Sequence, residues 1–100
     1  MPVYVLPQVI KTTLIAAGTV ANTVVKGAPG TYYGVLLSSV GVGTPGVFDN
    51  ATTNTGTPVG QLAASAPLGA YPTISGGVPC VNGITVAGGA TNPAMTVLWS

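Results

Sequence analysis

Residues 31–40 read TYYGVLLSSV, a run of flat, β-branched and aliphatic side chains that predicts a β-strand. Side chains alternate across a strand, so neighbouring positions face opposite sides of a sheet. The two faces would be Tyr33, Val35 and Leu37 on one side and Tyr32, Gly34, Leu36 and Ser38 on the other. Neither face is strongly polar. We therefore expect one face to pack on the core and the other on a neighbouring chain.

Similar strands are predicted on either side of this stretch. In Val9–Ala17, Ile10 and Leu14 alternate with Lys11, which indicates that the Lys11 face is the wetter one. Asn82-Gly83 stands between PCV and ITVA and predicts a hairpin, because a type I′ turn needs positive φ at both central residues. Residues 94–99 predict a last strand that ends at Trp99.

Turn residues interrupt the chain at short, regular intervals, and the segments between them are too short for helices of typical length. Several short strands at this spacing predict one all-β domain, a β-sandwich or barrel of about 7–9 short antiparallel strands. We expect this domain to span residues 9–100 and to follow an extended arm at 1–8, since Pro2 and Pro7 favour extended backbone. The predicted core is Ile10, Leu14, Val24, Tyr33, Val35, Leu37, Val47, Val59, Leu62, Val81, Ile84, Val86, Val97 and Trp99.

The composition excludes most classes of function. Among 100 residues only Lys11, Lys26 and Asp49 are formally charged, and His and Glu are absent. General acid–base catalysis needs side chains that titrate near neutral pH, so we expect no enzyme and no catalytic, cofactor-binding or metal site. A net charge of +1 leaves no basic surface for nucleic acid. Gly, Pro, Thr and Asn interrupt every apolar run, and the first residues lack a basic region, so neither a membrane span nor a signal peptide is predicted.

Three short motifs invite functional readings, and a structural reading is favoured for each. Residues 41–46 match GxGxxG, but a strand-like segment follows and no acidic residue lies downstream of Asp49, so we interpret them as a turn. Residues 50–52 fit a glycosylation sequon, and we expect Asn50 to form a turn there. We expect Asp49 to cap the same turn through the backbone amides of Asn50 or Thr52.

The remaining chemical groups are isolated in the sequence. Cys80 has no His, Asp or Glu near it and is predicted to be a buried, inert thiol. Lys11 and Lys26 are predicted to be edge charges that discourage pairing between strands of different molecules. The aromatic residues are predicted to lie in the core or at a subunit interface: Tyr4, Tyr32, Tyr33, Phe48, Tyr71 and Trp99.

Three segments together carry a resemblance to known proteins: VVKGAPGTYYGVLL (24–37), VFDNATTNTGTPVGQL (47–62) and VNGITVAGGATNPAMTVLWS (81–100). They resemble small virion proteins of tailed bacteriophages, over roughly residues 20–100. The resemblance implies a capsid decoration, or cement, protein. It would be a small jelly-roll or β-sandwich that sits as a trimer on the outer surface of an icosahedral head and bridges major capsid protein subunits. The chain departs from these proteins in being almost uncharged and in having Trp99 where tyrosine is commoner.

We expect such a protein to act through its surfaces. The predicted contact regions are the Met1–Pro7 arm, which would reach a neighbouring subunit, and the loops at 50–58 and 88–93. Two other classes stay open: a carbohydrate-binding module of a phage head fibre or tail, with aromatic rings on one exposed face, and a cell-surface or pilus-type subunit, which would need export.

Overall fold

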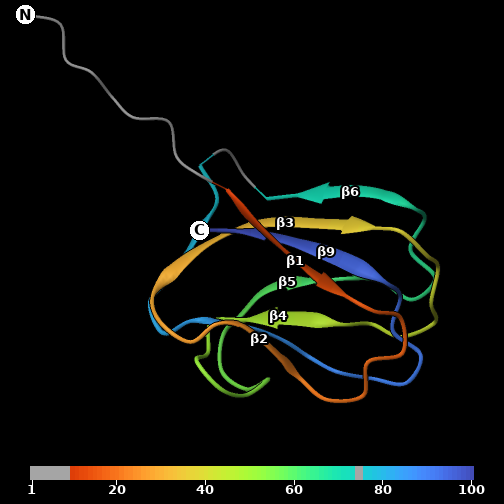
Figure 1. The fold of residues 1–100 in the computed structure, drawn as a ribbon, viewed down its shortest axis with the longest axis horizontal. Helices are drawn as coiled ribbons and strands as arrows, with labels where there is room; N and C mark the ends of the chain where they lie inside the picture. The colour runs from red at the N-terminus through yellow and green to blue at the C-terminus, as the bar shows by residue number, and fades with distance from the viewer. Residues whose placement is uncertain (1–9, 74–75) are drawn as a thin grey trace, which may run out of the picture.

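A computed structural model of the chain describes residues 10–73 and 76–100, and over these residues it is all-β, with two antiparallel sheets (Figure 1). The strands are β1 (Lys11–Ile15), β2 (Thr23–Lys26), β3 (Gly30–Leu37), β4 (Gly46–Phe48), β5 (Pro58–Gln61), β6 (Gly69–Pro72), β7 (Val78–Cys80), β8 (Ile84–Val86) and β9 (Met95–Trp99). This confirms the predicted fold class and strand number. The predicted arm, residues 1–8, lies outside the described residues.

The strand pairing is that of a jelly roll. β1 pairs with β9, β2 with β8, β3 with β6 and β4 with β5, as in a long antiparallel hairpin whose two arms each contain four strands. Wrapping this hairpin places β9 beside β3 and β8 beside β4, which gives the sheet orders β1-β9-β3-β6 and β2-β8-β4-β5. β7 is an additional strand that pairs with the first half of β3. Double-sheet jelly rolls are built in this way.

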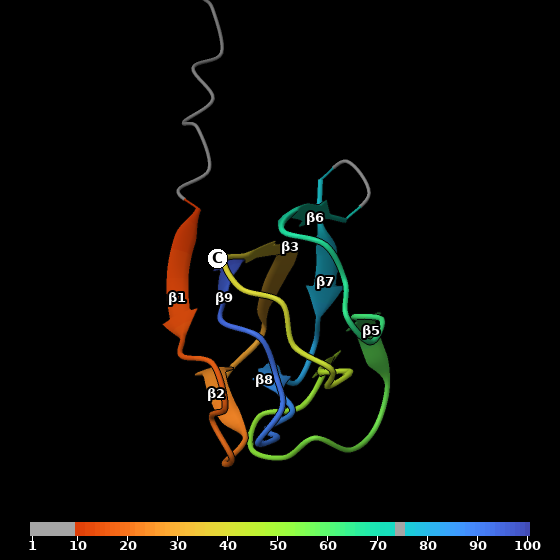
Figure 2. The same cartoon turned by 90° about the vertical axis from the view of Figure 1, so that its right-hand side faces the viewer.

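The core lies between the two layers, and Figure 2, seen from the right-hand side of Figure 1, shows β1 and β2 on one side of the sandwich and β5 and β6 on the other. Predicted core residues that are buried are Val35, Leu37, Val47, Leu62, Ile84, Val86 and Val97, and Val59 and Trp99 pack against them while partly buried. Tyr33 is only half-buried. The core list did not include six further buried side chains, of which Cys80 and Tyr32 were expected to be buried on other grounds: Ile15, Tyr32, Ala66, Cys80, Thr85 and Met95.

The predicted inward face of β1 is wrong. Leu14 is 74% exposed and Ile10 is also exposed, whereas Ile15 is 7% exposed. The face that carries Ile15 points inward, whereas Lys11, on the same face at the start of the strand, stays exposed, with its ammonium 5.1 Å from the ring centroid of its pairing partner Trp99. A lysine is compatible with this face because it lies at the end of the strand, where its ammonium stays exposed to water beside an aromatic ring.

In β3, irregular strand pairing explains why the prediction of the core-facing side chains is partly wrong. The register between β3 and β9 shifts between Tyr32 and Gly34, so Tyr33 is an extra residue and the alternation changes there. Tyr32 and Val35 are consequently both buried. A similar irregularity between Val24 and Lys26 leaves Val24 exposed and packs Val25 against the core instead.

The predicted Asn82-Gly83 hairpin is also wrong. β7 pairs with β3 in one sheet and β8 with β2 and β4 in the other, so the segment at 81–83 crosses between sheets. Its backbone N–H groups are bound by the Asp49 carboxylate. The predicted core residue Val81 is exposed on this crossing.

Each edge strand of the two sheets carries a residue that disfavours further pairing. The edges are β1 on one side of the larger sheet and β6 and β7 on the other, where β7 carries Pro79, and β2 and β5 in the smaller sheet. Lys11 and Lys26 lie on β1 and β2, as predicted for edge charges, and Pro72 and Pro58 lie on β6 and β5. Lysine and proline both discourage strand addition, proline because it has no N–H to donate.

Candidate functional site: a charge-free end and an inter-sheet cleft

The strand registers bring four connections to one end of the sandwich. Ile15, at the end of β1, and Leu37, at the end of β3, both pair with Met95 at the start of β9, and Leu37 also pairs with Gly69 at the start of β6. The connections β1–β2, β3–β4, β5–β6 and β8–β9 therefore lie together, on the right in Figure 1. They comprise residues 16–22, 38–45, 62–68 and 87–94, and we call this surface the charge-free end.

No charged side chain occurs in those four connections. Lys11 lies at the start of β1, Lys26 at the end of β2 and Asp49 directly after β4, which places all three at the opposite end of the sandwich. The charges of this protein are therefore segregated. One end carries every ionic side chain, and the other can be buried against a partner without removing a charge from water, which is costly for an unpaired ion.

Backbone hydrogen bonds connect these loops to one another. Asn92 accepts from Gly18 at 3.0 Å, and Thr91 accepts from Gly43 at 2.9 Å. Gly41 accepts from the N–H of Ser65 at 2.9 Å. The Asn92 side-chain amide also donates to the Ala87 carbonyl at 3.0 Å. The charge-free end is consequently a preorganised platform, which reduces the entropy lost when it binds.

Apolar side chains project from this platform. Val20, on the β1–β2 connection, is 72% exposed, and Val42, on the β3–β4 connection, is 65% exposed. Val40 on the β3–β4 connection and Leu68 on the β5–β6 connection are exposed as well. Scattered exposed aliphatic residues are common on proteins, but here they gather on an end that has no charge. This combination is what a surface covered by another protein requires.

The outer face of the larger sheet extends the apolar surface. One register row crosses four strands, from Leu14 through Thr96 and Leu36 to Ala70. The next row contains Thr12, Leu98, Gly34 and Pro72. Leu14 and Leu36 are exposed, and neither row contains a charge. The core-facing side of the central strand is confirmed by buried Val35 and Leu37, and on its outer face Leu36 stays exposed among the described residues.

At the opposite end the charged groups have structural partners. The Asp49 carboxylate accepts from the backbone N–H groups of Asn82 at 2.8 Å, Val81 at 3.1 Å and Gly83 at 3.3 Å, and these bonds hold the pKa of Asp49 below its usual range. Asp49 therefore does not cap its own turn as predicted. That role belongs to Asn50, whose Oδ1 accepts from the Thr52 and Thr53 N–H groups, both at 2.9 Å.

Both lysines lie beside the same ring. Lys11 Nζ is 5.1 Å and Lys26 Nζ is 5.8 Å from the Trp99 ring centroid, and the indole N–H donates to Thr13 Oγ1 at 2.8 Å. These contacts close the side of the sandwich between β1 and β2. The two lysines therefore contribute to the stability of the fold, because an ammonium over an aromatic face is stabilising.

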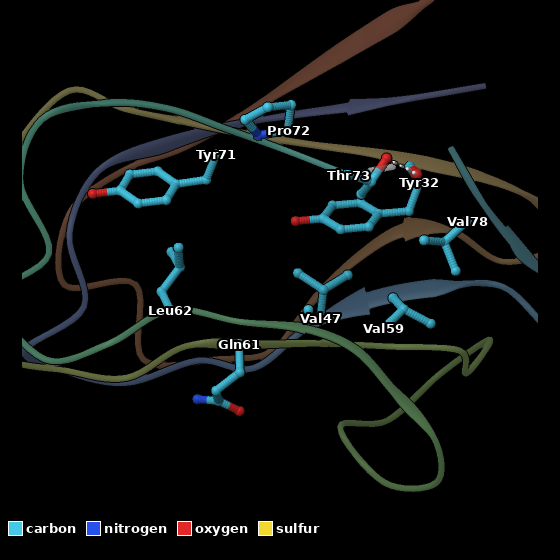
Figure 3. A pocket seen from close by; sticks show the side chains of 10 residues that line it. Tyr32, Val47, Val59, Gln61, Leu62, Tyr71, Pro72, Thr73 and Val78 are labelled. Atoms are coloured by element: carbon cyan, nitrogen blue, oxygen red, sulfur yellow. Dashed lines mark hydrogen bonds between the residues drawn. The ribbon is translucent and has the colours of Figure 1, made fainter. Parts of the chain in front are cut away.

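The opposite side of the sandwich, between β5 and β6, is open. A cleft of about 380 Å³ lies between the sheets there, with Tyr32 and Tyr71 facing Leu62, Val47 and Val59 across it (Figure 3). Its lining residues are Tyr32, Val47, Val59, Gly60, Gln61, Leu62, Tyr71, Pro72, Thr73 and Val78. None is charged. The Tyr32 hydroxyl points into the cleft, and burial, followed by the nearby Cys80, raises the pKa of Tyr32 to about 12.

The other predicted groups occupy structural positions. Residues 41–46 run from the β3–β4 loop into β4, with no helix after them, as a turn reading requires. Cys80 is buried, as predicted, and burial raises the pKa of its thiol. Within residues 10–73 and 76–100, no three His, Cys, Asp or Glu side chains lie close enough to hold a metal ion. In the same part of the chain no helix has the length and hydropathy to cross a membrane.

The predicted contact loops are separated by the fold. Residues 50–58 lie at the charged end and residues 88–93 belong to the charge-free end, while Met1–Pro7 lies outside the described residues. Sequence reasoning missed Val20, Val40, Val42 and Leu68. The available signal was apolar side chains inside turn-rich segments that contain no charge, as in SSVGVGTP at 38–45. It also missed the cleft, which depends on how two distant edge strands come together.

Comparison with known proteins adds no relative, since no protein-family model, curated protein or solved structure matches the chain.

Proposed function

We propose that this protein is a viral structural protein, a decoration or cement protein of a tailed-phage head. It binds the outer surface of the capsid and bridges major capsid protein subunits, as a trimer. The observation that carries the proposal is the charge-free end, a hydrogen-bonded platform with exposed Val20, Val40, Val42 and Leu68 and no ionic group. A jelly roll with one apolar end is suited to this task, because cementing a shell needs buried interface and no chemical step.

The proposed mechanism is additive burial. Each subunit contributes its apolar end to the shell, and a cyclic trimer presents three copies of that end. Linked contacts reinforce one another, because after the first site binds the others bind at a high effective concentration. Weak single contacts then suffice to hold neighbouring capsid subunits together.

A carbohydrate-binding role in a head fibre or tail is the second candidate, and the cleft is the observation in its favour. Tyr32 and Tyr71 supply aromatic rings, which could stack on a sugar. Gln61 is the one planar polar side chain on the lining, and its amide donates to the Thr44 carbonyl. The Tyr71 hydroxyl donates to the Pro67 carbonyl, and the Tyr32 hydroxyl points into the cleft. The rest of the facing walls is mainly aliphatic and aromatic, which favours an apolar occupant over a sugar.

The position of the protein in an electron-microscopy map of intact particles encoded by the same genome tests the first proposal. Trimeric density on the outer surface of the head, between capsomers, is expected. Absence from purified particles, or density confined to the tail, would overturn it.

Single substitutions then test which surface binds. Val20→Lys and Val42→Lys place a charge on the charge-free end, and Val81→Lys is the matched control because Val81 is 71% exposed at the charged end. Binding to purified heads that lack the protein should weaken at least about tenfold for the first two, since an unpaired charge would be buried. The control should bind as the native protein does. Equal effects of all three would contradict the assignment of this surface.

A further inference from the structure

The inter-sheet cleft has the shape and chemistry of a binding groove. It opens between two edge strands, β5 and β6, which belong to different sheets and have no strand neighbour on that side among the described residues (Figure 2). Its volume of about 380 Å³ lies within the range of ligand pockets, roughly 300–1,000 Å³. The rings of Tyr32 and Tyr71 form one wall, and aliphatic side chains form the other (Figure 3).

The edges of the cleft determine what kind of occupant fits. Pro58 on β5 and Pro72 on β6 remove backbone N–H groups from the two rims, so a new strand gains little by pairing along them. Recognition must then come from side chains entering between the sheets. An extended, proline-containing apolar segment matches this, because such segments dock into aromatic-lined grooves at a low cost in conformational entropy.

The chain itself contains such a segment outside the described residues. Residues 1–9 read MPVYVLPQV, with no charged side chain, two prolines and five residues that are aliphatic or aromatic besides Met1. They precede Ile10 and β1, and β1 and β6 are the opposite edges of the larger sheet. Nine residues extend to about 30 Å, whereas four strands span only about 14 Å, so the segment is long enough to reach beyond its own domain.

We propose that residues 1–9 of one copy bind in the cleft between β5 and β6 of the next copy. A contact between two different surfaces repeats from subunit to subunit and closes into a ring when the rotation allows. The donor edge, β1, and the acceptor edge, β6, lie on opposite sides of the sandwich, which is the arrangement that a ring needs. This inference rests on the proposed function for its stoichiometry, a trimer, and it uses a surface separate from the charge-free end.

Two full-length variants test the two partners of the proposed contact separately, one by changing the cleft and the other by changing the segment. Val78→Asp places a carboxylate in the cleft, at a residue that is only partly buried and lines its wall. V5D/L6D charges both faces of the segment, because successive residues of an extended chain point to opposite sides. Val42→Asp is the control, a valine exposed far from the cleft on the charge-free end.

The measurement is the mass in solution, by light scattering and sedimentation equilibrium, with thermal unfolding of each variant to establish that it is folded. Native protein and Val42→Asp should form the same closed oligomer, and the two cleft-and-segment variants should each be monomers. An equimolar mixture of Val78→Asp and V5D/L6D should form a dimer that grows no further, because only one intact segment meets one intact cleft. If Val78→Asp proves too unstable, Val78→Thr, a nearly isosteric change that adds a hydroxyl at the same lining residue, should weaken self-association about tenfold.

A native protein that stays monomeric, or variants that assemble as the native protein does, would overturn the inference. The same holds if the mixture stays monomeric, as it would if the cleft held a sugar. Binding of each segment to the cleft of its own chain would show as a monomeric native protein. These outcomes leave the proposed function untouched, because head binding is measured separately with Val20→Lys and Val42→Lys. Failure of those variants to weaken head binding would in turn leave the result on self-association unchanged.

Discussion

The Asp49 carboxylate accepts a hydrogen bond from the backbone N–H of Asn82 at 2.8 Å, across 33 residues of sequence. Together with the bonds from Val81 and Gly83, it fixes the crossing between the two sheets. One side chain thus connects the β4–β5 loop to the β7–β8 connection.

Stability in acid should depend on this one carboxylate. The bonds favour the charged form and lower the pKa of Asp49, so its stabilisation is fully present above about pH 4, the unfolded pKa, and is lost as the pH falls through the lowered folded pKa. Asp49→Asn should lower the unfolding midpoint at neutral pH and flatten the acid dependence. Because the chain has no other Asp or Glu, an unchanged acid limb in the variant would contradict this. Chemical denaturation at a series of pH values gives the comparison.

At alkaline pH the relevant groups are Tyr32 and Cys80, whose burial raises both pKa values. Burial disfavours their charged forms, so stability is present below the unfolded pKa of each and falls as the pH rises above it. For Tyr32 the window runs from about pH 10 to about pH 12, and the full effect is about 3 kcal/mol. Tyr32→Phe should remove the loss in this window, as followed by unfolding and by tyrosinate absorbance.

The orientation of β1 predicts opposite outcomes for two adjacent residues. Ile15→Ala should destabilise the fold by about 2–4 kcal/mol, because it leaves a cavity in the core. Leu14→Ala should change stability by less than about 0.5 kcal/mol in the isolated chain. Equilibrium unfolding of both variants checks the inward face. The reverse order would mean that the strand faces the other way.

At the bulge in β3, any side chain in place of Gly34 should destabilise the fold. Its φ is +130°, and a Cβ there would lie 2.8 Å from the Cα of Pro72 and still closer to the Tyr71 carbonyl. Gly69 on the neighbouring strand has a φ of +140° and open space around it, which makes Gly69→Ala the control for backbone strain alone. Gly34→Ala should destabilise by at least 2 kcal/mol more than the control, at roughly the cost of overpacking. Equal losses of unfolding free energy in Gly34→Ala and Gly69→Ala would contradict the predicted clash at Gly34.

Attachment through the charge-free end should respond weakly to salt. Screening shortens the range of charge interactions from about 10 Å to 3 Å between 0.1 M and 1 M salt, but it does not weaken apolar burial. We expect the affinity for purified heads to change by less than about threefold over that range. A steep loss of binding with salt would point to ionic contacts and away from this surface.

The sequence contains enough to predict the class of fold, because short Val-, Thr- and Tyr-rich segments between turn residues specify strands locally. The sequence pattern misleads where pairing between strands changes the regular alternation of inward and outward side chains. The extra residue at Tyr33 reverses the phase of β3, and the face of β1 that carries Lys11 is the one that buries Ile15, because Lys11 itself stays exposed beside the ring of Trp99, 88 residues away. Asn82-Gly83 has the local preference of a hairpin, but the Asp49 carboxylate provides stronger partners for the N–H groups.

The candidate site was less predictable than the fold. Its scarcity of charge is plain in the composition, whereas the gathering of Val20, Val40, Val42 and Leu68 at one end follows from jelly-roll wrapping, which no local pattern encodes. The cleft depends on the separation of β5 and β6, which belong to different sheets. Long-range topology therefore decides which of the weakly polar segments become surfaces for binding.

The four sheet edges bear on how this protein behaves when it is crowded. With only three charges, electrostatic repulsion does little to keep copies apart, and a β-rich chain of this kind is at risk of open-ended fibre growth. Lys11, Lys26, Pro58 and Pro72 place one obstacle on each open edge. Copies can therefore be concentrated side by side, and their association stays limited to side-chain contacts of defined stoichiometry, with runaway strand stacking suppressed at all four edges.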